Sequence, residues 1–182
     1  MSKMNVGDVN SQARGSGARD NAGKLEWAIM PLNQVLMALR AFSPKTEIRP
    51  YDLLRCAADF QEHPSNQTAM NMLVAGVDFL CWDLDLSFEK AMVQVVRVWD
   101  MGRDKYAAWN WMKGMNWSVP LNCAWRHAWE LFKYEMSDEG GNVIDPESGI
   151  HHAAHYICNA MMLVHYVKFY PEGDDLPGQW FD

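Results

Sequence analysis

Apolar residues recur at helical spacing along most of this chain, and this periodicity restricts the folds that the chain can adopt. The clearest stripe has members at i, i+4, i+7, i+8 and i+11: Phe88, Met92, Val95, Val96 and Trp99. Such spacing places every member on one face of a helix, as a buried face requires. The sequence shows no strand-like alternation of polar and apolar residues. We therefore expect an all-α fold: a helical bundle of about six helices, with a Trp-rich loop and a flexible N-terminal tail.

The ends of the expected helices carry typical start and stop residues. Ser43-Pro44 ends the first helix, because proline cannot continue the hydrogen-bond ladder of a helix. Pro50 suits the first turn of the second helix, and Ser87 is a typical N-cap. The expected helices cover residues 25–41, 49–62, 66–84, a segment opened by Ser87, about 119–134 and about 146–170.

The chain is expected to hold one helical domain, residues 24–176, between two short ends. Residues 1–23 are rich in Gly, Ser and Asn without periodicity, which is typical of a flexible segment. Its end, a Gly/Arg/Lys loop over residues 17–24, is either a disordered lead-in or a loop that closes on a phosphate. Residues 177–182 form the C-terminal tail.

Composition argues against several classes of partner. The net charge of −7 disfavours a nucleic-acid polymer, which needs clustered Lys and Arg. No apolar run approaches the roughly 18 residues of a membrane span, and the N-terminus lacks an apolar signal region. We therefore expect no membrane contact and a cytoplasmic location. The four cysteines lie in apolar stretches and form no C-x-x-C pair, which indicates reduced core thiols.

The last expected helix has two opposed stripes. At roughly 100° per residue, one stripe is apolar and must face a core: Ile150, Ala154, Ile157, Met161 and Val164. His152, His155 and Asn159 fall on nearly the opposite side, with apolar neighbours on both flanks. We therefore expect a buried polar stripe, which is either a hydrogen-bonded part of the core or a set of ligands. His151, about a quarter-turn away, is expected to be peripheral.

Further titratable residues precede that helix. His127 and Glu135 lie in the helix before it, and Asp145 and Glu147 lie in the connection. An antiparallel hairpin of these two helices can bring the side chains together. Mixed histidine and carboxylate ligands suit divalent ions such as magnesium or manganese. Asp145 before Pro146 also suits a helix N-cap, a role that needs no chemistry.

Residues 105–117 combine three tryptophans with lysines and asparagines. Such a stretch can line a pocket that stacks a base and holds its phosphates. It can equally be a Trp-rich loop packed over one end of the bundle.

At these residues the sequence resembles the MazZ-type dATP/dGTP diphosphohydrolases of phages and prophages, which are related to MazG-like nucleotide pyrophosphohydrolases. The resemblance covers about residues 1–42 and 88–176, and residues 43–87 look like inserted helices. The segments that carry it are Gly17–Lys24, Val98–Gly102, Lys105-Tyr106, Trp109–Trp111, Lys113-Gly114, Arg126-His127, Glu135, Asp145–Gly149, His152, His155, Asn159 and Tyr170–Asp175.

The resemblance implies hydrolysis of a deoxypurine nucleoside triphosphate, dGTP or dATP, to the monophosphate and pyrophosphate. It implies a divalent metal, Mg²⁺ or Mn²⁺, and a homo-oligomer in phage nucleotide metabolism in the host cytoplasm. Metal ligands are then expected at Glu135, Asp145, His152 and His155, with His127 and Glu147 in catalytic roles. Substrate contacts are expected from Arg19, Asn21, Lys24, Lys105, Tyr106, Trp109, Asn110, Trp111, Lys113, Arg126 and Asn159.

A second hypothesis from another class is a non-catalytic phage protein that binds a nucleotide or blocks a host defence. The expected insertion and the abundance of Trp and Met suit an interaction surface. Pyrophosphate release separates the two hypotheses.

Overall fold

The computed structural model describes residues 31, 38, 41, 47–136 and 141–177. Within these residues the chain forms five α-helices: α2 Pro50–Glu62, α3 Asn66–Asp83, α4 Phe88–Tyr106, α5 Ser118–Met136 and α6 His152–Phe169. Two short 3-10 helices, η2 Asn110–Lys113 and η3 Pro171–Gly173, follow α4 and α6. The β-structure of this part is one isolated bridge between Ile144 and His151. The all-α prediction is confirmed.

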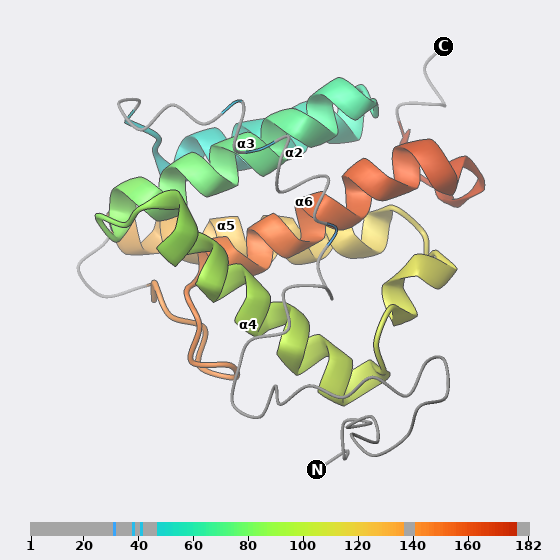
Figure 1. The fold of residues 1–182 in the computed structure, drawn as a ribbon. Coiled ribbons are helices and arrows are strands. Elements are labelled where there is room, and N and C mark those ends of the chain that lie inside the picture. The colour runs from blue at the N-terminus through green and yellow to red at the C-terminus, as the bar shows by residue number, and fades with distance from the viewer. Residues whose placement is uncertain (1–30, 32–37, 39–40, 42–46, 137–140, 178–182) are drawn as a thin grey trace, which may run out of the picture.

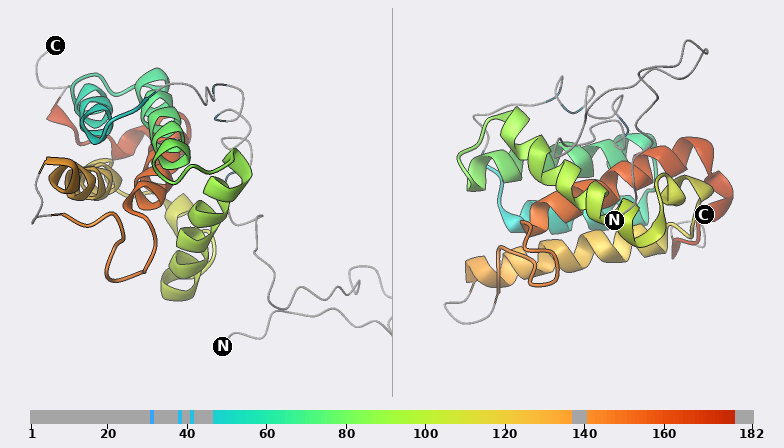
Figure 2. Two further views of the ribbon diagram at one scale, coloured as in Figure 1. Left: turned by 90° about the vertical axis from the view of Figure 1, so that its left-hand side faces the viewer. Right: turned by 60° about the horizontal axis from the view of Figure 1, so that its bottom comes forward.

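Helix α6 lies at the centre of the bundle. It packs against α3, α4 and α5, while α2 packs against α3 and α5 (Figure 1). Figure 2 shows α5 running along α6, with α4 crossing α6 obliquely. The predicted apolar stripe of α6 is buried as expected, and so are most residues of its opposite side. None of the described helices is long and apolar enough to cross a membrane.

The expected starts of two helices agree with the structure. Pro50 occupies the first turn of α2, and the Ser87 side chain accepts a hydrogen bond from the backbone N–H of Lys90 at the start of α4. The four cysteines are free thiols, as predicted. The expected helix over 25–41, the tail 1–23 and most of the tail 177–182 lie outside the described residues.

The expected start of the last helix is wrong. Residues 145–149 form a turn in which the Asp145 carboxylate accepts hydrogen bonds from Ser148, and Gly149 has a φ of +68°. Helix α6 begins only at His152, where the His151 side chain accepts a hydrogen bond from the backbone N–H of Ala153. The N-cap is therefore His151, six residues beyond Asp145.

The hairpin of α5 and α6 is joined at both ends. The turn between the helices holds one end. At the other end, the segment after α6 returns to α5: the Asp175 carboxylate accepts hydrogen bonds from the backbone N–H (2.9 Å) and hydroxyl (2.6 Å) of Ser118. Beside it, the Trp117 indole N–H donates to the Tyr170 carbonyl at 2.9 Å. These contacts fix the axial position of α5 relative to α6.

Gly76 permits the close approach of α3 to α6. A methyl group on Gly76 would lie 2.8 Å from Ile157 Cγ1 and 2.9 Å from Tyr156 Cδ1. Both neighbours are fully buried, so neither can move aside. We expect Gly76→Ala to lower the free energy of unfolding by about 1–3 kcal/mol, as overpacked core substitutions do.

Urea unfolding followed by circular dichroism measures this effect. Gly102→Ala is the matched control, because a methyl group at this position in α4 meets no atom within 4 Å among the described residues. The control should gain up to about 1 kcal/mol from the helix propensity of alanine. Equal stabilisation of both variants would show that the α3–α6 contact tolerates an added methyl group.

Candidate active site

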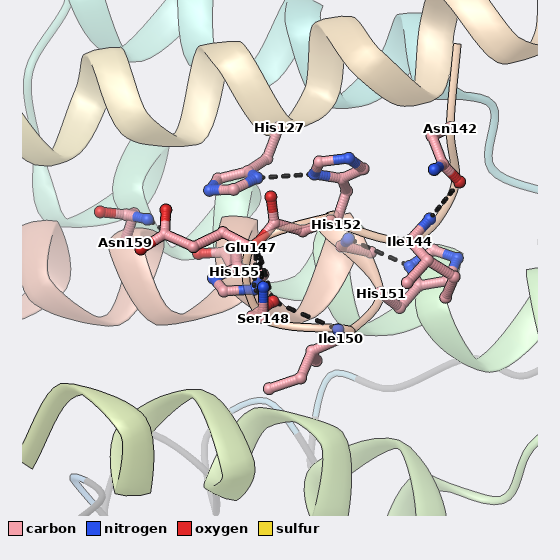
Figure 3. A network of polar contacts seen from close by, with 12 residues as sticks. His127, Asn142, Ile144, Glu147, Ser148, Ile150, His151, His152, His155 and Asn159 are labelled. Atoms are coloured by element: carbon pink, nitrogen blue, oxygen red, sulfur yellow. Dashed lines mark hydrogen bonds and ion pairs between the residues drawn. The ribbon is translucent and has the colours of Figure 1, made fainter. Parts of the chain in front are cut away.

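Two histidines from neighbouring helices meet at the centre of the candidate site. His127 of α5 and His152 of α6 lie with their Nδ1 atoms 2.7 Å apart, a hydrogen-bond distance (Figure 3). The His155 ring, one turn further along α6, stacks on His127 with centroids 4.6 Å apart and planes inclined by 16°. His152 and His155 are buried, as the sequence predicted. We call these three residues the histidine cluster.

The turn before α6 places the Asp145 carboxylate next to the histidine cluster, linked to it through Ser148. Burial raises the pKa of the Asp145 carboxyl, but hydrogen bonds from the Ser148 hydroxyl and backbone N–H outweigh this effect and hold the pKa below its ordinary value. Because Asp145 is ionised, the Ser148 hydroxyl donates to it, at 2.7 Å. The same hydroxyl oxygen lies 2.8 Å from His155 Nε2 and, because its own proton points to Asp145, it accepts a hydrogen bond from the Nε2–H. His155 is thus the Nε2–H tautomer, with a lone pair on Nδ1.

Burial keeps the cluster uncharged at neutral pH. Burial, together with the neighbouring imidazoles of His155 and His152, lowers the pKa of His127 to about 3. Burial likewise lowers the pKa of His152 and of His155, in each case against the opposing effect of Asp145. Desolvation disfavours the protonated form of an imidazole, which explains the common direction.

A neutral pair joined through Nδ1 must hold two different tautomers. One ring donates its Nδ1–H and the other accepts it. The donating ring then has no proton on Nε2, so this atom carries a lone pair. This nitrogen can therefore accept a hydrogen bond from a water molecule at neutral pH, which is the contact that a general base needs.

A pocket of about 590 Å³ borders the cluster. We call it the histidine pocket, and its lining is Trp125, Arg126, His127, Trp129, Glu130, Asn142, Asp145, Pro146 and His152. Arg126 provides a cation on its wall, next to the imidazole pair. A guanidinium in this position suits an anionic group such as a phosphate.

A second pocket, of about 350 Å³, lies between α4, η2, α5 and α6. It is mainly apolar, and we call it the tryptophan pocket because Trp99, Trp109 and Trp111 line it. Four other lining residues bear on the site: Tyr106, Asn110, Cys123 and Asn159. Of the predicted substrate-binding residues, the structure brings five together here: Tyr106, Trp109, Asn110, Trp111 and Asn159.

The two pockets are neighbours along α5 and α6. Cys123 lines the tryptophan pocket and Arg126, one turn later, lines the histidine pocket, with Arg126 Nη2 3.2 Å from Cys123 Sγ. On α6, Asn159 Nδ2 donates to the His155 carbonyl at 2.8 Å. The two pockets therefore border neighbouring turns of the same two helices.

The loop that borders the tryptophan pocket has an unusual backbone. Ala107 and Trp109 have φ values of +82° and +62°, a region that residues with a side chain rarely adopt. Strained backbone of this kind is concentrated at binding and catalytic sites, where the surrounding structure holds it in place.

A protein-family model described as "dATP/dGTP diphosphohydrolase, N-terminal" matches residues 80–176, more than half of the chain. The chain belongs to this family. No curated protein and no solved structure matches it in the corresponding comparisons. The family segment contains both pockets entirely, and the resemblance to dATP/dGTP diphosphohydrolases is confirmed. A phage origin and a relation to MazG-like enzymes stay predictions.

Other predicted site residues of this dATP/dGTP diphosphohydrolase family member lie around the pockets. Lys105 at the end of α4 forms an ion pair with Glu147, with Nζ and Oε1 3.2 Å apart. Lys113 is exposed at the end of η2. Glu135 pairs with Arg49 at 2.9 Å, near the end of α5. Arg19, Asn21 and Lys24 lie outside the described residues.

The predicted metal ligands are not arranged as ligands of one ion. Among the described residues, no group of three or more His, Cys, Asp or Glu side chains converges as a metal site. The Nδ1 atoms of His127 and His152 instead face each other, and His155 Nε2 faces the Ser148 hydroxyl. The four-residue metal set therefore stays a prediction.

Sequence reasoning missed the roles of Ser148 and His151. Ser148 links Asp145 to His155, and its position three residues after an aspartate is the available signal, since an aspartate side chain often accepts from the backbone N–H three residues on, as an N-cap does. His151 is not peripheral: it is 1% exposed, and its Nε2 lies 2.9 Å from the Asp83 carboxylate at the end of α3. No local pattern connects two residues so far apart in the sequence.

Proposed function

We propose that this protein hydrolyses a deoxypurine nucleoside triphosphate, dGTP or dATP, to the monophosphate and pyrophosphate. The observation that carries the proposal is the contiguity of a ring-lined apolar pocket and an uncharged imidazole pair on the same two helices. The family description names the same substrates. Phage nucleotide metabolism, a host-cytoplasmic location and a homo-oligomer belong to the same proposal.

In this proposal the tryptophan pocket holds the base. Its volume of about 350 Å³ lies within the roughly 300–1,000 Å³ of small-molecule sites. Trp109, which is 42% exposed, is the candidate for stacking, because indole rings pack well against flat heterocycles. The triphosphate then extends along α5 toward Arg126. Lys105 provides a second cation when its ion pair with Glu147 opens and its ammonium group binds a phosphate instead.

The reaction consumes one water molecule. The ring that donates its Nδ1–H in the His127–His152 pair has a lone pair on Nε2. This nitrogen takes a proton from the water molecule while the water oxygen attacks the α-phosphorus. The phosphoanhydride bond between the α- and β-phosphates breaks, and pyrophosphate leaves with the electron pair of that bond. Arg126 stabilises the negative charge that develops on the phosphate oxygens.

We further propose that the activity requires Mg²⁺ or Mn²⁺. The donors suited to such an ion are the Asp145 carboxylate and the imidazoles of His152 and His155, since ligands must be unprotonated and all three are so at neutral pH. A bound divalent ion supplies positive charge against the triphosphate. Calorimetric titration of the nucleotide-free protein with Mn²⁺ should show binding that His155→Ala weakens.

The activity itself is tested with purified protein and each of dGTP, dATP, dCTP and dTTP, with Mg²⁺ or Mn²⁺. We expect the purine nucleotides to yield monophosphate and pyrophosphate in equal amounts, and chelation with EDTA to stop the reaction. Release of inorganic phosphate in place of pyrophosphate would show that a different phosphoanhydride bond is cleaved. Tight binding without any product would favour the non-catalytic alternative.

A further inference from the structure

Two buried N–H groups of the tryptophan pocket have no partner among the residues that the structure describes. Trp99 of α4 and Trp111 of η2 are each 6% exposed, and both line this pocket. Among the described residues, neither indole Nε1 atom finds a hydrogen-bond acceptor. A buried donor without an acceptor costs about 1–3 kcal/mol, so unpaired N–H groups of this kind call for an explanation.

Both rings are held firmly in place. They contact each other, with centroids 5.2 Å apart and planes inclined by 50°. The Trp111 backbone carbonyl accepts a hydrogen bond of 2.6 Å from the Tyr166 hydroxyl, and the Trp111 ring meets His165 edge-on at 4.9 Å. Neither indole can swing its N–H into bulk water without disrupting this packing. A ligand in the pocket that these two residues line can supply the acceptor that the described residues do not.

We infer that the indole N–H groups of Trp99 and Trp111 hydrogen-bond to the purine base and select a 6-oxopurine, guanine, over adenine. This inference rests on the proposed function. Guanine presents two neighbouring acceptors, O6 and N7, whereas adenine presents N7 beside an N6 amino group, which is itself a donor. The two indole N–H groups can pair with O6 and N7 of guanine. On adenine, one of the two N–H groups would face the N6 amino group, which is also a donor.

The test measures binding rather than turnover, by calorimetric titration with dGMP and dAMP. We expect the protein to bind dGMP at least tenfold more tightly than dAMP. Trp99→Phe and Trp111→Phe, which keep an aromatic ring but remove the N–H, should each weaken dGMP binding by about three- to tenfold. Their effect on dAMP should be smaller, so the dGMP-to-dAMP ratio falls. Trp82→Phe is the matched control, because Trp82 is 45% exposed at the end of α3.

Base analogues test the same contacts in the unaltered protein, which covers the case of a variant that does not fold. The monophosphate of deoxyinosine keeps O6 and N7 and should bind about as tightly as dGMP. The 7-deaza analogue of dGMP lacks the N7 acceptor and should bind several-fold more weakly. Equal affinity for dGMP, dAMP and 7-deaza-dGMP would overturn the inference.

The outcomes separate this inference from the proposed hydrolysis. Guanine-selective binding that depends on both indoles, without pyrophosphate release from dGTP, supports the base contacts and refutes the activity. Pyrophosphate release with a dGMP-to-dAMP ratio that neither substitution changes leaves the activity standing and refutes the base contacts. In that second case the face of the His165 ring, rather than a ligand, would satisfy the Trp111 N–H.

Discussion

Replacing His127 with glutamine should lower the rate of pyrophosphate release from dGTP by about 10²–10⁴-fold, the usual contribution of a general base. The pairing of His127 Nδ1 with His152 Nδ1 at 2.7 Å leaves an unprotonated nitrogen on one of the two rings, and burial keeps the pair neutral. Glutamine is similar in size and can accept a hydrogen bond, but its amide does not take up a proton near neutral pH. The chemical step should therefore suffer more than binding.

Steady-state kinetics and circular dichroism together check this result. The value of kcat should fall while KM changes by only a few-fold and helix content stays the same. His63→Gln is the control, since His63 is exposed directly after α2, away from both pockets. A variant that retains kcat but has a strongly raised KM would assign His127 to substrate binding and remove the pair from the chemistry.

The second large effect is a loss of stability in mild acid. His127 has a pKa of about 3 in the folded protein, far below the ordinary value of 6.5 expected in the unfolded chain, and burial also lowers the pKa of His152 and His155. Between these values the unfolded chain binds protons that the folded protein does not. The free energy of unfolding must then fall as the pH falls from about 6.5 toward 3. We expect a loss of roughly 2–4 kcal/mol between pH 7 and pH 4.

Urea unfolding at several pH values measures this dependence. His127→Gln should flatten the slope below pH 6.5, because the variant removes a group whose folded pKa lies far below its unfolded value. His63→Gln, at an exposed position, is the control. A pH dependence that is identical in the unaltered protein and in His127→Gln would show that His127 is protonated in the folded state at mildly acidic pH.

The sequence was sufficient to predict the helices because their determinants are local. Apolar stripes locate α2 to α6, and residues such as Pro50 and Ser87 place two of the starts within a residue. The burial of His152 and His155 was also predictable, since apolar residues flank them on both sides of α6. The start of α6 was misplaced because Asp145-Pro146 is equally suited to a tight turn, and the hydrogen bonds of Ser148 favour the turn.

The contacts that assemble the site could not be predicted in the same way. The meeting of His127 with His152 depends on how far α5 is shifted along α6, and no periodicity encodes this quantity. The pairing of Glu135 with Arg49 depends on α2 packing against α5. Trp99 carried the pattern of a core residue, which is correct, but its position on a pocket wall follows from the placement of η2. These contacts join residues of different helices, so they depend on how the helices pack and not on local sequence patterns.

The attachment of Ser118 to Asp175 has a consequence for how the imidazole pair is maintained. An α-helix rises about 1.5 Å per residue, so an axial slip of α5 by two residues, about 3 Å, would take the two Nδ1 atoms of the 2.7 Å contact out of hydrogen-bonding range. Such a slip is opposed at both ends of the hairpin: by the turn between the helices at one end, and by the Ser118–Asp175 hydrogen bonds at the other. The alignment of the two Nδ1 atoms thus depends partly on Asp175, which holds Ser118, nine residues before His127 on α5.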